Sequence, residues 1–159
     1  MSNRVNHFKT VPALVKSLQA VSIAVEKISI DPRLKYLIDL RASQLNKCAF
    51  CVDMHSKQAK IKGERELRLY HIPIWRESPL FSAKEKAALA LTEALTNIDQ
   101  NGVDDKLYGH ISEYFTQEEI SEITVAIGLV NMWNRLQILS QMEPGLLDET
   151  YGLEKVCLN

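Results

Sequence analysis

The sequence lacks the features that mark several large protein classes. Its charges nearly cancel, with 19 Lys and Arg against 20 Asp and Glu, so no broad basic face is available to neutralise a phosphate backbone. No stretch reaches the roughly 18 uninterrupted apolar residues of a membrane span, and the first residues lack the apolar run of a secretory signal. We therefore expect a soluble, cytoplasmic protein that binds neither nucleic acid nor membranes.

Cysteine is also scarce. The chain has three cysteines, an odd number that fits no closed disulfide framework. Two of them form a Cys48-x-x-Cys51 pair, and in a reducing cytosol this spacing indicates redox or metal chemistry. Cys157 is interpreted as an incidental thiol in a loose tail, because chain ends are commonly disordered.

The hydrophobic pattern is helical along the whole chain. Internal repeats and low-complexity segments are absent, and alternating apolar and polar runs are scarce. With 159 residues and 46% hydrophobic content, residues 1–159 are predicted to form a single all-α domain of about six to seven helices. The expected helices run from Pro12 to just before Asp31, over 34–44, 46–63 and 64–70, from a capping box at Ser82 to about Asn97, from Asp104 through Phe115, and from a capping box at Thr116 to Leu139.

The segment from Ile120 to Leu139 is apolar on nearly all sides. A helix of this kind is buried, either at the centre of a protein or between subunits. Because a small domain has limited room for a doubly buried helix, we expect a homo-oligomer that assembles through this segment. A central core helix in a monomer is the alternative.

The stretch from Cys48 to His55 concentrates the reactive side chains. At ~100° per residue, Cys48, Cys51 and His55 fall within about a 60° sector of a helix, so both sulfurs and the imidazole share one face. With Asn46 as the helix cap, Cys48 lies in the first turn, where unpaired backbone N–H groups favour a thiolate over a thiol. His55, one turn beyond Cys51, is placed to take or relay the Cys51 proton. The two cysteines can then close into a disulfide.

Three interpretations of this stretch compete with redox chemistry. A structural zinc site needs four ligands, and only Cys48, Cys51 and His55 cluster here. Haem attachment requires a histidine directly after the second cysteine, where this chain has Val52. Two cysteines packed as small apolar residues beside a hydrogen-bonded histidine are the structural alternative. No residue cluster calls for a metal or an organic cofactor.

The residues around the cysteines closely resemble a known family. Residues 40–59 (LRASQLNKCAFCVDMHSKQA), with 75–78, 85–96 and 130–135, are similar to the alkylhydroperoxidase D-like core of the carboxymuconolactone decarboxylase superfamily. The resemblance covers about residues 12–145. It implies an all-helical fold that assembles into trimers, hexamers or related oligomers, with the cysteine helix facing a pocket near a subunit interface.

The resemblance also implies roles for individual residues. In the enzymes that this sequence resembles, the second cysteine attacks a hydroperoxide to form a sulfenic acid, the first resolves it as a disulfide, and a histidine relays a proton. Carried over by motif, Cys51 is the peroxidatic cysteine, Cys48 the resolving cysteine and His55 the relay. The implied partners are a hydroperoxide substrate and a thiol, lipoylated or thioredoxin-like electron donor.

Two positions depart from the family pattern. The family's characterised peroxidase carries a glutamate twelve residues before the first cysteine, where this chain has Tyr36, and a histidine between the cysteines, where it has Phe50. A phenol has an ordinary pKa near ~10, so Tyr36 can donate a hydrogen bond in the relay or the pocket but is a poor base at neutral pH. Asp39 is expected to be a solvated surface charge. Fewer proton carriers predict a slower or different redox role.

The leading functional prediction is a thiol-dependent antioxidant peroxidase that works through Cys51 and Cys48. A protein disulfide reductase and a redox sensor are alternatives that use the same pair. A non-redox decarboxylase acting on a lactone is a further alternative, weakened because lactone chemistry has no need of paired cysteines. Arg135 is interpreted as a buried arginine that pairs with a helix-end carboxylate across a subunit interface.

Overall fold

The computed structural model describes residues 4–156, and over that range the regular structure consists of helices alone. The elements are α1 (His7–Thr10), α2 (Pro12–Val25), α3 (Pro32–Leu45), α4 (Ala49–Ile61), α5 (Glu66–His71), the 3₁₀ helix η1 (Ile72–Ile74), α6 (Ala83–Thr96), α7 (Asp105–Ser112), α8 (Gln117–Ser140) and α9 (Asp148–Tyr151). The all-α prediction is confirmed. The predicted number of helices was too low, because the four-residue helices α1 and α9 are too short to show an apolar period. No helix in the described range is long and apolar enough to cross a membrane.

The starts of the helices follow from local sequence signals. Ser82 forms a capping box with Glu85, in which each side chain accepts a hydrogen bond from the other residue's backbone N–H, and Thr116 begins α8 in the same way. The side chain of Asp104 caps α7. Pro12 occupies the first turn of α2, where its missing N–H leaves no hydrogen bond unmade. These predicted starts are confirmed.

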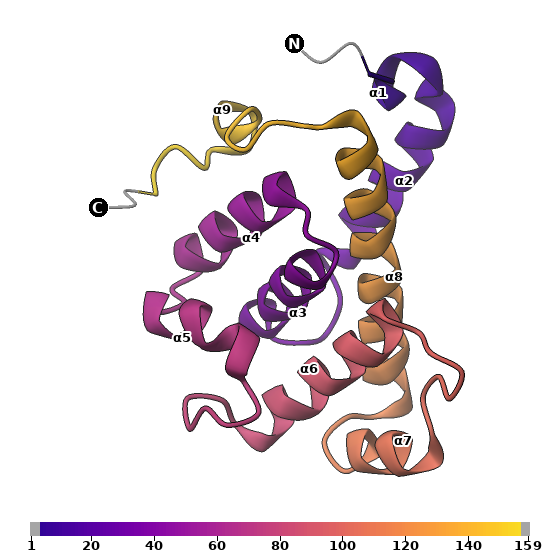
Figure 1. Ribbon diagram of the computed structural model, residues 1–159, viewed down its shortest axis with the longest axis vertical. Helices are drawn as coiled ribbons and strands as arrows, with labels where there is room; N and C mark the ends of the chain where they lie inside the picture. The colour runs from indigo at the N-terminus through magenta and orange to yellow at the C-terminus, as the bar shows by residue number, and fades with distance from the viewer. Residues whose placement is uncertain (1–3, 157–159) are drawn as a thin grey trace.

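Helix α3 lies at the centre of the fold (Figure 1), where it packs against α4, α6 and α8. Ile38 belongs to an apolar cluster shared with α6, α7 and α8, and Leu37 to a second cluster shared with α4, α5 and α6. The helix is therefore enclosed on nearly all sides. Its buried residues are Leu34, Lys35, Tyr36, Leu37, Ile38, Asp39, Leu40, Ala42 and Ser43.

Helix α8 was predicted to be apolar and buried all round, but the single chain buries one side of it and leaves the other open. The buried side includes Ile123, Ile127 and Asn134. Large apolar side chains remain exposed on the opposite side: Val125, Met132 and Leu139. The alternative of a helix buried at the centre of a monomer is therefore wrong. Assembly of several chains through this exposed apolar surface stays a prediction.

Candidate functional site

The cysteine pair begins α4, but that helix starts later than the predicted range of 46–63. Asn46 was predicted to cap it, yet Cys48 is its N-cap and Asn46 is the C-cap of α3. Between them Lys47 adopts a left-handed backbone with a φ of 59°, which turns the chain from α3 into α4. Asparagine suits either end of a helix, so the local sequence could not decide between the two roles.

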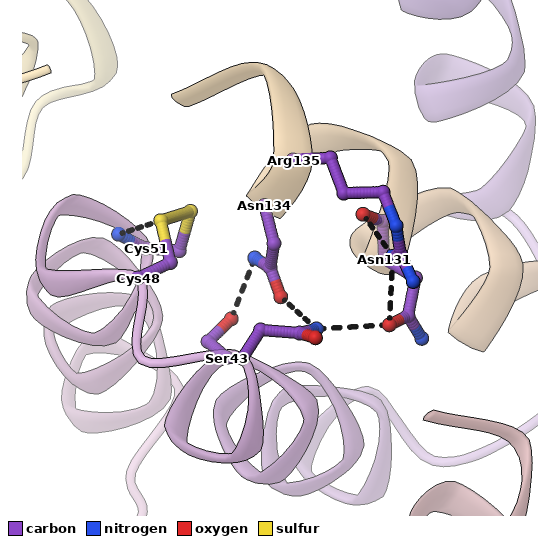
Figure 2. The surroundings of a disulfide bond; sticks show 7 residues. Ser43, Cys48, Cys51, Asn131, Asn134 and Arg135 are labelled. Carbon is purple, nitrogen blue, oxygen red and sulfur yellow. Dashed lines mark hydrogen bonds between the residues drawn. A yellow bond between two sulfur atoms is a disulfide. The ribbon is translucent and has the colours of Figure 1, made fainter. Parts of the chain in front are cut away.

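Cys48 and Cys51 form a disulfide at this turn, with their Cα atoms 5.3 Å apart (Figure 2). Both residues are buried, with exposed fractions of 2% and 1%. The Sγ atom of Cys48 also accepts a hydrogen bond from the backbone N–H of Cys51 at 3.4 Å. When the disulfide is reduced, this N–H at the start of a helix favours a thiolate at Cys48 over a thiol.

His55 lies one turn beyond Cys51 on α4 and is buried. Its Nδ1 lies 2.8 Å from the side-chain oxygen of Gln58 and 4.0 Å from Oδ2 of Asp39. An amide oxygen only accepts hydrogen bonds, so Nδ1 carries the ring proton and Nε2 keeps its lone pair. Burial lowers the pKa of His55 below its ordinary value, although Asp39 and Gln58 act in the opposite direction. At neutral pH the imidazole is therefore an uncharged base that can accept a proton at Nε2.

The buried His55 predicts a loss of stability in mild acid. Because its pKa is lower in the folded protein than in the unfolded chain, the unfolded state binds the proton first as the pH falls below about 6.5. We expect the free energy of unfolding, measured in urea, to decline from about pH 7 towards the lower folded-state pKa. A His55→Gln variant should show a shallower decline; an identical pH dependence in the two proteins would contradict this prediction.

A buried ionic network lies behind His55. Asp39 was predicted to be a solvated surface charge, and this is wrong: it is 4% exposed, and its Oδ2 lies 2.8 Å from Nζ of Lys35. Lys35 is also paired with Glu26 at 2.8 Å. Burial acts to lower the pKa of Lys35, but Asp39 and then Glu26 raise it well above its ordinary value. The prediction failed because α3 is enclosed, so that the helical angle of Asp39 does not lead to solvent.

Tyr36 stands where the related peroxidase has glutamate, and its hydroxyl donates a hydrogen bond to Glu26 at 3.4 Å. Burial raises the pKa of Tyr36, and the nearby carboxylate of Glu26 adds to this effect. The phenol therefore stays protonated at neutral pH and cannot act as a base there. The acid that approaches His55 is instead Asp39, three residues further along α3.

Asparagine side chains tie the turn before the cysteines to α8 (Figure 2). The amide nitrogen of Asn46 donates to the side-chain oxygens of Asn131 and Asn134, each at 2.8 Å. Asn134 is fully buried and donates in turn to the hydroxyl of Ser43 at 3.1 Å. Arg135 is exposed in the single chain and donates to the backbone and side-chain oxygens of Asn131, and its burial across a subunit interface stays a prediction. The network holds the backbone just before Cys48 in place.

Replacing Asn134 with alanine should destabilise the protein by about 1–3 kcal/mol, because Asn46 and Ser43 each lose a buried hydrogen-bond partner. Urea denaturation measures this change in the free energy of unfolding. The matched control is Asn101→Ala at an exposed position, which should change stability by less than about 0.5 kcal/mol. Equal effects of the two substitutions would contradict a structural role for the network.

A pocket of about 350 Å³ opens beside Cys48. It is lined by residues 47–50, by Gln137 and Ile138 near the end of α8, and by residues 141–144, and Cys51 is not among its lining residues. A larger pocket of about 630 Å³ lies elsewhere, among charged residues that include Arg33 and Arg68, and neither cysteine borders it. The smaller pocket is the relevant one, because Cys48 is among its lining residues.

The sequence also led to predictions about metal binding and the third cysteine. Within residues 4–156 no group of three or more His, Cys, Asp or Glu side chains is placed to hold a metal ion. Cys157 lies outside the described residues. Gln58 was missed by sequence analysis, although its spacing of three residues from His55 on one helix was a signal that the two side chains could meet.

Known proteins are similar to this chain in sequence and in the arrangement of helices. Residues 11–94 match the carboxymuconolactone decarboxylase family. The uncharacterized protein YdfG of Bacillus subtilis is 37% identical over 138 residues, which are 87% of this chain and 94% of that protein. A protein of unknown function from Agrobacterium tumefaciens, suggested to be the antioxidant defence protein AhpD, is 38% identical with a TM-score of 0.85 over 90% of this chain and 99% of that one. An AhpD-core protein from Ralstonia eutropha, described as an uncharacterized peroxidase-related protein, shares the fold at 18% identity, with a TM-score of 0.78 over 94% of this chain and 78% of that one.

Proposed function

Because this chain belongs to the carboxymuconolactone decarboxylase family and carries an AhpD-like cysteine pair, we propose that it is a thiol-dependent peroxidase. It reduces hydroperoxides with electrons from an external thiol. The observation that carries the proposal is the bonded pair of Cys48 and Cys51 at the start of the helix that also bears the buried His55. Lactone decarboxylation has no use for such a pair.

In the proposed reaction, the thiol of reduced Cys51 gives its proton to Nε2 of His55. The thiolate attacks one peroxide oxygen, the O–O bond breaks, and Cys51 becomes a sulfenic acid. The departing alkoxide takes the proton from His55 and leaves as an alcohol. The Cys48 thiol then loses its proton and its sulfur attacks the sulfenic sulfur; the disulfide forms, and the departing hydroxide takes up that proton and leaves as water. The peroxide gains the two electrons that the two thiols lose.

The surroundings of the two sulfurs support this division of roles. Cys51 is one helical turn from His55, the spacing at which side chains on a helix meet. Cys48 receives the N–H of Cys51 and borders the pocket, which suits a sulfur that resolves the sulfenic acid and then exchanges with the electron donor. Thiol attack on Cys48 releases Cys51 as a thiolate and leaves the donor's sulfur bonded to Cys48. A second thiol of the donor then displaces Cys48 and restores the starting state.

A thiol titration tests the proposal. Reduced Cys157→Ser protein, which retains only Cys48 and Cys51, is mixed with one equivalent of tert-butyl hydroperoxide, and free thiols are counted. We expect both thiols to disappear, and continued consumption of peroxide when dithiothreitol is supplied. A disulfide that forms slowly, with no turnover in the presence of dithiothreitol, is the behaviour of a redox sensor and would overturn the proposal.

Gln58 is expected to act as a positioning residue for His55. Replacing Gln58 with leucine removes the acceptor of the Nδ1 proton. We expect the rate of Cys51 oxidation at pH 7 to fall about tenfold, which is less than the full contribution of general acid–base catalysis because His55 itself remains. A Gln58→Glu variant retains an acceptor and adds a negative charge that raises the pKa of His55. Its rate should therefore recover, with the acid limb of the pH profile moved to higher pH. An unchanged rate in the leucine variant would contradict this role.

A further inference from the structure

The chain that follows α8 runs past α4 (Figure 1), where Asp148 at the start of α9 contacts Lys57 of α4. Gln141, with a left-handed φ of 51°, ends α8 and begins this segment. We call residues 141–153 the C-terminal strap. Met142 and Leu147 of the strap pack against the cluster of Cys48, Phe50 and Cys51. Leu153, at the far end of the strap, is buried. The strap therefore contributes to the burial of the disulfide.

Lys57 forms ion pairs with Asp53 and Asp148 that hold the strap on α4, and we call these three residues the Lys57 clasp. Lys57 is 7% exposed, and its Nζ lies 2.7 Å from Oδ2 of Asp53 on the same helix and 2.6 Å from Oδ2 of Asp148 on the strap. The backbone N–H of Gly145 donates to the same oxygen of Asp53 at 3.0 Å. One buried ammonium thus joins two carboxylates from segments far apart in sequence. Loss of the ammonium would leave two carboxylates facing each other.

The closed strap leaves a restricted approach to the disulfide. The pocket of about 350 Å³ borders Cys48 and is walled on one side by strap residues 141–144. This volume is at the lower end of the range for small-molecule pockets, so it suits a small thiol or a slender thiol-bearing arm. Cys48 is only 2% exposed, so a thiol fixed in the broad surface of a folded protein has poor access to it.

We propose that the strap and its Lys57 clasp determine which reductants reach the disulfide: closed, the strap admits small or arm-borne dithiols through the pocket and excludes dithiols set in a protein surface. In the admitted reaction a thiolate of the reductant attacks Sγ of Cys48 and the Cys48–Cys51 bond breaks. Cys51 leaves as a thiolate that takes up the proton. The second thiol of the reductant then displaces Cys48, and the reductant leaves as its own disulfide. The inference rests on the proposed function only in requiring that this disulfide is reduced during the cycle.

The test compares two reductants on the oxidised protein, without peroxide. The probes are dithiothreitol, as a small dithiol, and reduced thioredoxin, as a protein dithiol, and the measured quantity is the rate at which the Cys48–Cys51 disulfide is reduced. In a Lys57→Met variant we expect the rate with thioredoxin to rise about tenfold while the rate with dithiothreitol changes less than about twofold, because exchange rates depend on access to the sulfur. The control is Lys62→Met, the same substitution at an exposed lysine outside the clasp.

Asp148→Asn provides a second variant if Lys57→Met fails to fold, since it weakens the strap side of the clasp and leaves the pair of Lys57 and Asp53 intact. It should raise the ratio of the thioredoxin rate to the dithiothreitol rate in the same direction. An unchanged ratio in both clasp variants, or an equal rise with both reductants, would overturn the proposal. Because no peroxide is used, this experiment can be interpreted even if the protein has no peroxidase activity.

Discussion

Replacing Cys51 with serine is expected to reduce peroxidase turnover by about a thousandfold or more, because a hydroxyl cannot form the sulfenic acid on which both later steps depend. The measurement is the consumption of tert-butyl hydroperoxide with dithiothreitol as the electron donor. Cys51 and His55 are buried on successive turns of α4, so the substitution removes the sulfur and leaves the proton acceptor in place.

Cys48→Ser separates the two sulfur roles. This variant should still react with the first equivalent of peroxide, but its sulfenic acid has no resolving thiol, and excess peroxide should carry Cys51 to sulfinic and sulfonic acids. Cys157→Ser serves as the control and is expected to retain the wild-type rate. Full turnover in the Cys51 variant would refute the assignment of Cys51 as the peroxidatic cysteine.

Replacing Lys35 with methionine should cause the largest loss of stability, about 3–5 kcal/mol, because Asp39 would be left as a buried carboxylate without its cation. The long apolar stem of methionine fills much of the same space, so the loss reports the charge more than the packing. Urea denaturation at pH 7 measures the change in the free energy of unfolding. Lys27→Met, at an exposed position, should change stability by less than about 0.5 kcal/mol.

A double variant distinguishes a lost ion pair from a general intolerance of substitution at Lys35. When Asp39 is also replaced by leucine, no buried charge remains without a partner, and most of the stability should return. A Lys35→Met protein as stable as wild type, or a double variant less stable than the single one, would contradict the importance of this buried pair.

The helix starts and the reactive stretch could be predicted because their signals are local. A capping box such as the one at Ser82 needs only four consecutive residues, and the Cys48–Cys51 spacing needs the same number. The cap of α4 could not be assigned in this way. Asn46 is suited to both helix ends, and its hydrogen bonds go to Asn131 and Asn134, more than eighty residues away in sequence.

Burial and long-range contacts account for the other differences between prediction and structure. Asp39 was expected to face solvent because a surface helix has one exposed side. Three neighbouring helices pack around α3, so the side that carries Asp39 is buried. The strap contains only the four-residue helix α9 and has no apolar period that would predict its position. It is held beside α4 by the contact between Lys57 and Asp148, which no local pattern predicts. Gln58 looks like an ordinary polar residue of a helix until its contact with His55 is known.

The most direct test of Cys51 as the sulfur that peroxide oxidises is to trap its sulfenic acid. A Cys48→Ser, Cys157→Ser double variant is treated with one equivalent of tert-butyl hydroperoxide in the presence of dimedone, and peptides are analysed by mass spectrometry. We predict consumption of the peroxide and a dimedone adduct on Cys51. Unconsumed peroxide and an unlabelled Cys51 in the folded variant would contradict the proposed peroxidase chemistry.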